Sequence, residues 1–486
     1  MFPRAALWAF PFIVVSTSAA FAKAPTPEGA AHLIGVFQSY LGTTEGVVSV
    51  ELAGEAYAVS IDFAVLAGLI AGKDATVAIT PIEFSLTDQG DGTWAMQQDQ
   101  ALSMKLVVPG VIDSAHEIGS FKSEGVFDEN LAAFTNWTMD FTNLKIDQVI
   151  SDPEMPTTDV TYTIASGHSE QTVTAGETAG VDVRIVTTLN DLVETFKVPA
   201  TSEEASSTDI SLAAKTYASD GTIVGLRTAA VHRLLAWIVA HPSEAAMKAD
   251  QAALKVLLTE GLPFFGNMNI TGTMNTVNVT TPIGVFGAET AGIVLEANGL
   301  VENGLFREGF DLAGLSIPEG LAPAWGAALV PDSLSFDVKG EGFNLAAPAA
   351  RLIAAFDLND PASVNDGFMA GLLPVFLPKG AVDITLAPGH VTNATYDLRY
   401  EGVMTAGPGA IPTGRGRITA AGLDQVTKVL SAAPPEVSGQ IVPMLGMAQG
   451  MGKAEADGTV VWEIDAMIPG SLLVNGVDLA AMMGGQ

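Results

Sequence analysis

The chain has 486 residues and no cysteine, so disulfide bonds and thiolate metal sites are excluded. Hydrophobic residues make up 48% of it and charged residues only 16%, a composition that indicates a folded globular chain and excludes disorder. Acidic residues outnumber basic ones 54 to 22, and the net charge of -32 repels phosphate backbones, so nucleic acid is excluded as a partner.

The first 22 residues have the layout of a signal peptide. Arg4 supplies a positive charge, residues 5–15 form an apolar run, and residues 20–22 (Ala-Phe-Ala) are typical of a cleavage site. We therefore predict cleavage between Ala22 and Lys23 and a periplasmic location. The apolar stretch is shorter than the roughly 20 residues that a spanning helix needs, so no transmembrane span is expected in the mature chain.

Residues 23–225 are predicted to form a β-rich domain. A helix is expected over residues 28–40, where apolar residues recur at helical spacing. After it, Tyr57, Val59, Ile61 and Phe63 alternate with smaller or polar residues, which is the pattern of a strand with one buried and one wet face. The alternation returns in residues 102–108 and 137–141, with turn signals such as Gly-Asp-Gly between them. This order predicts an antiparallel meander.

Residues 226–265 are predicted to form a helical hairpin. The stretch 228–240 is almost wholly apolar and stops before His241-Pro242, as a helix does before proline. Ser243 is placed to cap a second helix over residues 244–260, which Gly261 and Pro263 would end. We expect the first helix to be buried between two sheets.

Residues 266–486 are predicted to form a second β-rich domain with helices. Met268, Ile270 and Met274 share one strand face, and the same alternation recurs near residues 334–338, 382–386, 396–400 and 460–468. Helices are expected over residues 346–356, 363–373, 423–432 and 437–451. Alternation implies a solvated sheet face, so the predicted class is α+β, with mainly antiparallel amphipathic sheets, interleaved helices and the central hairpin.

Searches for chemical motifs are negative. The sequence has no G-x-S-x-G, no H-E-x-x-H and no complete phosphate-binding loop, and its six histidines are scattered without ligand spacing. No catalytic residue, metal ligand or cofactor is therefore predicted. The stripe of Met444, Met447 and Met451 on the last helix is the one candidate for binding an apolar ligand, because thioethers adapt to varied apolar shapes; core packing is the alternative.

Several segments together resemble a known group of proteins. They are the signal peptide, the helix at 28–40 leading into residues 47–63, the Gly-Asp-Gly-Thr-Trp hairpin ending at Trp94, and the terminal segments 447–453, 459–464 and 473–479. In texture and order the chain is similar to uncharacterised exported proteins of alphaproteobacteria that are classed as a domain of unknown function. The resemblance implies an envelope protein and supplies no functional residues.

Three functional hypotheses follow from the sequence. The first is a non-catalytic periplasmic envelope protein that binds a lipid-like apolar ligand or another envelope component. The second is an exported hydrolase whose site is assembled from dispersed carboxylates and a histidine. The third is a structural or assembly factor, which the sequence does not separate from the first. The oligomeric state is left open.

Overall fold

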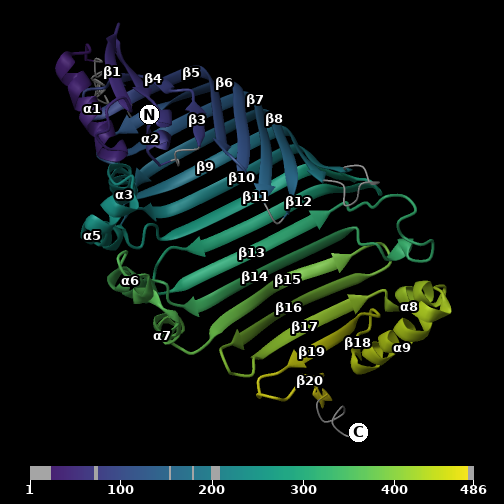
Figure 1. Ribbon diagram of the computed structural model, residues 1–486. Coiled ribbons are helices and arrows are strands. Elements are labelled where there is room, and N and C mark those ends of the chain that lie inside the picture. The colour runs from purple at the N-terminus through teal and green to yellow at the C-terminus, as the bar shows by residue number, and fades with distance from the viewer. Residues whose placement is uncertain (1–22, 71–74, 153–154, 178–179, 199–207, 480–486) are drawn as a thin grey trace, which may run out of the picture.

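The computed structural model describes residues 23–70, 75–152, 155–177, 180–198 and 208–479 (Figure 1). Within this part of the chain, 21 strands form a single sheet whose paired neighbours all run antiparallel. The predicted α+β class with mainly antiparallel strands is thus confirmed. One large open sheet, however, replaces the several meanders with interleaved helices that we expected.

The strands differ greatly in length. The first ten are β1 (Val48–Ala53), β2 (Ala56–Ile61), β3 (Thr76–Ile79), β4 (Ile82–Asp88), β5 (Thr93–Val108), β6 (Ile112–Asp128), β7 (Ala133–Asp152), β8 (Met155–Ala175), β9 (Val181–Val198) and β10 (Thr208–Leu226). The others are β11 (Asn267–Thr281), β12 (Gly284–Asn298), β13 (Gly304–Ala313), β14 (Ser333–Phe343), β15 (Val382–Thr392), β16 (Asp397–Ala406), β17 (Thr413–Ala421), β18 (Lys453–Ala454), β19 (Val460–Asp465), β20 (Leu473–Val474) and β21 (Val477–Asp478).

The helices lie in the connections at the ends of strands. They are α1 (Pro27–Leu41), α2 (Phe63–Ile70), α3 (Thr228–Ala240), α4 (Glu244–Ala249), α5 (Gln251–Gly261), α6 (Ala346–Ala355), α7 (Asp366–Phe376), α8 (Leu423–Ser431) and α9 (Pro435–Met451), with short 3-10 turns at Ala327–Leu329 and Pro361–Val364. Local chemistry sets several of these boundaries. The Thr26 side chain accepts a hydrogen bond from the Gly29 amide at the start of α1, and the Ser243 side chain caps α4.

Neighbours in the sheet nearly follow the order of the chain. The exceptions are that β2 pairs with β4, that β3 and β4 pair with different parts of β5, and that β17 pairs with β19. The pairing of β10 with β11 runs from Ser211↔Thr280 to Val224↔Asn267. The predicted hairpin region therefore leaves and rejoins one ladder, and the two β-rich parts share a single sheet.

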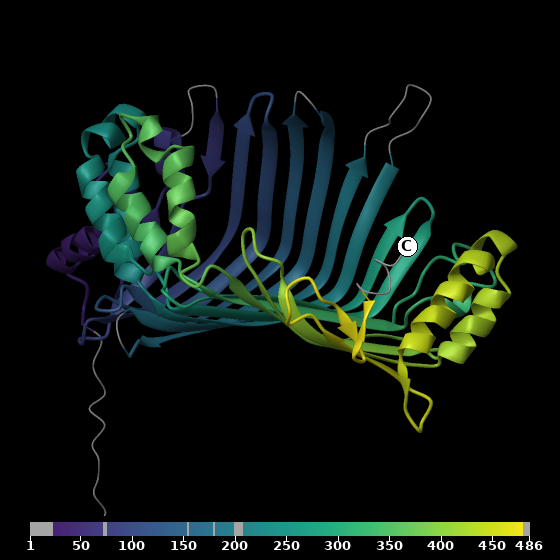
Figure 2. The same cartoon turned by 90° about the horizontal axis from the view of Figure 1, so that it is seen from below.

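The helical segment after β10 differs in two respects from the expected hairpin. The first helix, α3, has the predicted bounds, but the second is broken at Asp250 into α4 and α5. The expectation that α3 lies between two sheets is wrong, because the described strands form only one sheet. Figure 2 shows α3, α5, α6 and α7 standing together at one end of the sheet, with α8 and α9 at the opposite end.

The long strands bend along one line, which we call the crease. It consists of positions at which the paired registers skip a residue, namely Gly119, Asn143, Ala165, Asp191, Lys215 and Thr276. Asn143, Asp191 and Thr276 have positive φ values of 56°, 52° and 53°. Such residues interrupt the pleat and let a strand change direction, as a bulge does. Figure 2 shows the strands around β5 to β12 turning upward, toward the side that carries the helices.

The best-packed core lies at the N-terminal end of the sheet. Leu33 and Phe37 of α1 pack on Tyr57, Leu86 and Trp94, and all five side chains are buried. A second, smaller cluster surrounds Val173, Val181 and Val183. Tyr57 and the apolar residues of α1 belong to the predicted amphipathic patterns, whereas Leu86 lies in a strand that was not predicted. In the structure α1 covers the apolar side of β2, β4 and β5.

Candidate functional site

The candidate site is the side of the sheet that we call the apolar face. Paired registers assign to one face the following side chains of the strands from β11 onward: Met268, Ile270, Met274, Ile293, Leu295, Phe306, Phe310, Leu312, Leu334, Phe336, Val338, Ile384, Leu386, Val391, Leu398, Tyr400, Met404, Ile418, Trp462 and Ile464. Directly opposed residues of antiparallel strands lie on the same side. The alternation that the sequence predicted is therefore assembled into one continuous apolar surface.

The apolar face continues past the crease into the upturned halves of the long strands. There it consists of Val77, Ile79, Leu102, Met104, Leu106, Ile118, Leu144, Ile146, Val160, Tyr162, Ile164, Leu192, Phe196, Ile210, Leu212, Ala214, Val277, Val279 and Phe286. The alternation of side chains between the two faces is reset at the crease. In a regular strand, consecutive residues and residues three apart point to opposite faces. Here the consecutive Thr142 and Asn143 are both exposed, and Ile164 and Gly167, three apart, are both buried.

Burial shows that the two halves face the same side. Phe141 lies before the crease and Ile164 lies beyond it on the neighbouring strand, and both side chains are buried, whereas Asn143 and Ala165 of the crease are exposed. The inside of a bend is shielded from water and its outside is not. The apolar residues on both sides of the crease therefore line one concave surface, in agreement with the upturned strands in Figure 2.

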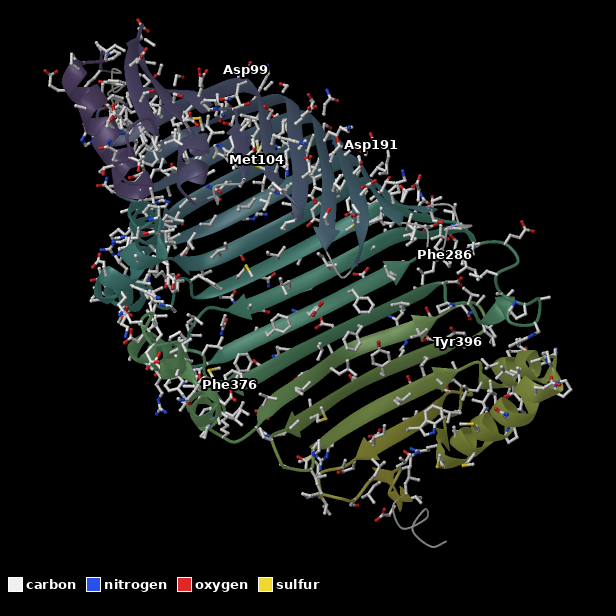
Figure 3. All side chains as sticks on the ribbon, viewed as in Figure 1. Asp99, Met104, Asp191, Phe286, Phe376 and Tyr396 are labelled. Atoms are coloured by element: carbon white, nitrogen blue, oxygen red, sulfur yellow. The ribbon has the colours of Figure 1, made fainter. Side chains whose placement is uncertain are left out.

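Among the residues that the structure describes, no second layer covers most of the apolar face. The structure describes strands β11 to β16 completely, and none of their hydrophobic side chains is buried. Phe306, Phe310 and Ile293 are 44%, 43% and 43% exposed, and Met404 is 40% exposed. In Figure 3 aromatic rings stand over these central strands, and no helix crosses them. A monomeric soluble protein rarely leaves so many neighbouring apolar side chains in water, so a surface of this kind indicates an interaction site.

Helices close the apolar face only at its ends. At one end the Trp462 indole donates to the Ala448 carbonyl of α9 at 2.8 Å. At the other, Phe376 of α7 packs on Phe343 with ring centroids 5.5 Å apart, as its place at the edge in Figure 3 shows. The helices therefore border the exposed surface and leave its centre open.

Aromatic rings lie flat on glycines along this face. A Cβ at Gly167 would fall within the Phe141 ring, one at Gly272 against Tyr217, and one at Gly389 against Tyr400. The Tyr400 hydroxyl also donates to the Ser335 carbonyl at 2.6 Å, so its polar tip is satisfied within the sheet. Glycine lets the rings lie down on the backbone, and the result is a smooth apolar floor.

The opposite side, the polar face, carries most of the charged side chains of the long strands. Ion pairs cross or run along it between Lys122 and Asp99 at 3.1 Å, between Arg184 and Asp220 at 2.6 Å, and between Lys145 and Asp147 at 2.7 Å, among others. Each such exposed pair adds little stability. Their shared position matters more, because it makes the two faces of the sheet chemically opposite.

Two open depressions lie on the polar face, and both contain charged side chains. One, of about 1030 Å³, is lined mainly by polar residues of β1, β2 and β4 to β7, including Glu51, Glu83 and Asp140. The other, of about 1010 Å³, contains Arg415 and Arg417, which pair with Asp465 at 3.2 Å and with Glu463 at 3.8 Å. These arginines already have carboxylate partners.

The predicted methionine site is distinct from the apolar face of the sheet. Met444 and Met447 lie on α9 and are 67% and 66% exposed, so the alternative of core packing does not hold for them. Met451 ends the same helix and is half-buried. Their role in ligand binding stays a prediction. The alternation in the sequence predicts the apolar side of the strands, which forms the larger surface, but that side was expected to be buried.

Histidine and serine come together at two places. Ser114 and His116 lie on the apolar face with Oγ and Nε2 2.8 Å apart, and Gln148 donates to the same Oγ at 3.2 Å. Ser335 and His390 form a second pair at 2.9 Å on the polar face. Ser114 is only 2% exposed, and a nucleophile must be reachable by its substrate. The contact of Ser114 with His116 is therefore a polar contact within one strand that satisfies a buried hydroxyl. The contact of Ser335 with His390 joins β14 to β15, and both of its residues are half-buried.

In the described part of the chain, no group of three or more histidine or acidic residues is placed to hold a metal ion. No helix there is long and apolar enough to cross a membrane. Comparison with known proteins adds no family: no family model, curated protein or solved structure matches the chain. The geometry of the sheet is therefore the basis for any functional argument.

Proposed function

We propose that this protein is a non-catalytic, exported carrier or receptor that binds acyl chains of lipid-like molecules along the apolar face. The single observation that supports the proposal most strongly is the absence of buried hydrophobic side chains from β11 to β16, although these strands are amphipathic. Covering that surface would remove a large apolar area from water.

The chemistry of a sheet face favours a chain-like hydrocarbon. Backbone N–H and C=O groups of the central strands are used in the plane of the sheet, from β11–β12 pairs such as Thr271↔Val294 through β16–β17 pairs such as Gly402↔Gly416. Recognition on the face is left to side chains, and these are mostly hydrocarbon. A ligand that binds there needs no directional hydrogen bonds over most of its length, which describes an acyl chain.

The concave shape adds to this argument. The upturned halves of β5 to β12 and the helices at both ends rise on the same side as the apolar face (Figure 2). A flexible chain can follow such a surface, whereas a rigid partner must match its curvature. A protein partner from the envelope and a purely structural role are kept as alternatives, as is the hydrolase.

A direct test is binding of dodecyl maltoside, below its micelle concentration, to the full purified mature chain, followed by calorimetry. We expect saturable binding with a negative heat-capacity change, the sign of apolar burial. Absence of binding by this and by longer-chain maltosides would refute the proposal and favour a protein partner, which co-purification from envelope extracts would then identify. N-terminal sequencing of the exported protein tests cleavage before Lys23, since residues 1–22 lie outside the described part of the chain.

A further inference from the structure

The apolar face differs from the polar face in the charges that it carries as well as in its polarity. All described lysines and arginines of the long strands belong to the polar face or point outward at the crease: Lys105, Lys122, Lys145, Arg184, Lys197, Lys215, Arg307, Lys339, Arg399, Arg415 and Arg417. Among these strands the apolar face therefore holds no permanent cation. This distribution is independent of the overall acidity of the chain, which affects both faces.

Two carboxylates interrupt the apolar face. Glu308 lies between Leu295 of β12 and Val338 of β14 and is exposed. Its neighbour Arg307 points to the other side and binds Asp337 at 2.6 Å, so it does not neutralise Glu308. A ligand that covers this part of the face would remove water from around Glu308, and the carboxylate would then interact with the head group at a lower effective dielectric.

The second carboxylate, Glu194, lies on the upturned half of β9. It is paired with Tyr162 of β8 and Leu212 of β10 on the apolar face. The register places the carboxylate of Glu194 directly opposite the phenol of Tyr162, and burial, followed by this negative charge, raises the pKa of Tyr162. The tyrosine hydroxyls offer hydrogen bonds to a neutral head group, and the carboxylate offers an ion pair to a cationic one.

We infer that the occupant of the apolar face is an acyl-chain amphiphile whose head group carries no net negative charge. This inference rests on the proposed function and narrows it to neutral and cationic lipids. An anionic head group that lies near Glu194 or Glu308 would be repelled by these carboxylates and would find no lysine or arginine of the long strands on this face to pair with, and an unpaired charge on an apolar surface is unfavourable.

The test compares three amphiphiles with the same dodecyl chain on the full mature chain: dodecyl maltoside, dodecyltrimethylammonium and dodecanoate, each below its micelle concentration. We expect the neutral and cationic compounds to bind, and dodecanoate to bind on the order of tenfold more weakly at low salt. The difference should shrink as salt is added, because salt screens charges on an open surface.

A matched pair of variants separates a local effect from that of net charge. Glu308→Gln on the apolar face should reduce the preference for dodecyltrimethylammonium over the maltoside by about two- to fivefold. Glu401→Gln removes one charge from an exposed position on the polar face of β16 and should leave that preference unchanged.

The outcomes distinguish the two proposals. Equal affinity for the three compounds, or tighter binding of dodecanoate, would overturn the inference while leaving acyl-chain binding intact. The same shift in both variants would also overturn it, because the selectivity would then come from net charge alone. Failure of the neutral maltoside to bind would overturn the proposed function, and the inference with it.

Discussion

Replacing Phe310 by glutamine tests whether the apolar face is the binding surface. Phe310 is 43% exposed, and its ring centroid lies 5.7 Å from that of Phe336, near the middle of the face. A buried aromatic side chain covers about 200 Å², so a ligand lying over Phe310 would cover roughly 85 Å² more and gain about 2 kcal/mol. Its loss in Phe310→Gln should weaken binding of dodecyl maltoside roughly 30-fold.

The same substitution should leave the protein folded. A fully buried phenylalanine contributes about 3–5 kcal/mol to the free energy of unfolding, and the partly exposed Phe310 should contribute about half of that. Val403→Gln is the matched control, because Val403 is 54% exposed on the polar face of β16. Calorimetric titration measures affinity, and denaturant unfolding measures stability. Unchanged affinity in Phe310→Gln, or an equal loss in Val403→Gln, would refute the assignment of the site.

Three further measurements address the apolar face, the crease and the polar face. From decyl to dodecyl to tetradecyl maltoside we expect the affinity to rise about twofold per methylene, because an open surface covers about half of each methylene group. A rise of about fourfold per methylene, which is typical of full burial, would contradict an open site. At the crease, where the φ of Thr276 is 53°, Thr276→Gly should raise the free energy of unfolding by up to about 1 kcal/mol, because glycine adopts positive φ without strain. Thr273→Gly in the regular part of the same strand should lower it, and equal effects of the two substitutions would refute strain at the crease. Hydrogen bonds to Asp140 and then Glu170 raise the pKa of His168, so the stability that His168 contributes is complete below its ordinary pKa of 6.5 and is lost as pH rises through the folded-state pKa. His168→Gln should therefore lower the melting temperature more at about pH 5.5 than at about pH 8.5. A difference that does not depend on pH would contradict this.

An acyl chain can bind to the apolar face without an enclosed cavity. Enclosed sites bury a small ligand on all sides, but a chain of many methylenes gains enough from contact on one side. The exposed Met444 and Met447 at the end of the sheet add soft apolar surface beside it.

Some features of this protein follow from short-range sequence patterns. Helices α1, α3, α8 and α9 were predicted nearly to the residue, since each has apolar residues at helical spacing and a proline or glycine at a boundary. Strand alternation around Met268 predicted an amphipathic antiparallel sheet, and that is confirmed. These properties depend on neighbours within one turn or one strand, so the sequence alone determines them. Even so, Phe63 extends the strand pattern in sequence but begins helix α2 in the structure.

Only the tertiary structure decided what happens to the apolar side of the sheet. Alternation shows that Phe310 and Phe336 share a face, but whether another layer covers them depends on residues far away in the chain. The pairing of β10 with β11 across an inserted helical segment and the reset of alternation at Asn143, Asp191 and Thr276 are likewise long-range. A local pattern determines which side of a strand is apolar, and the packing of distant elements determines whether that side is buried.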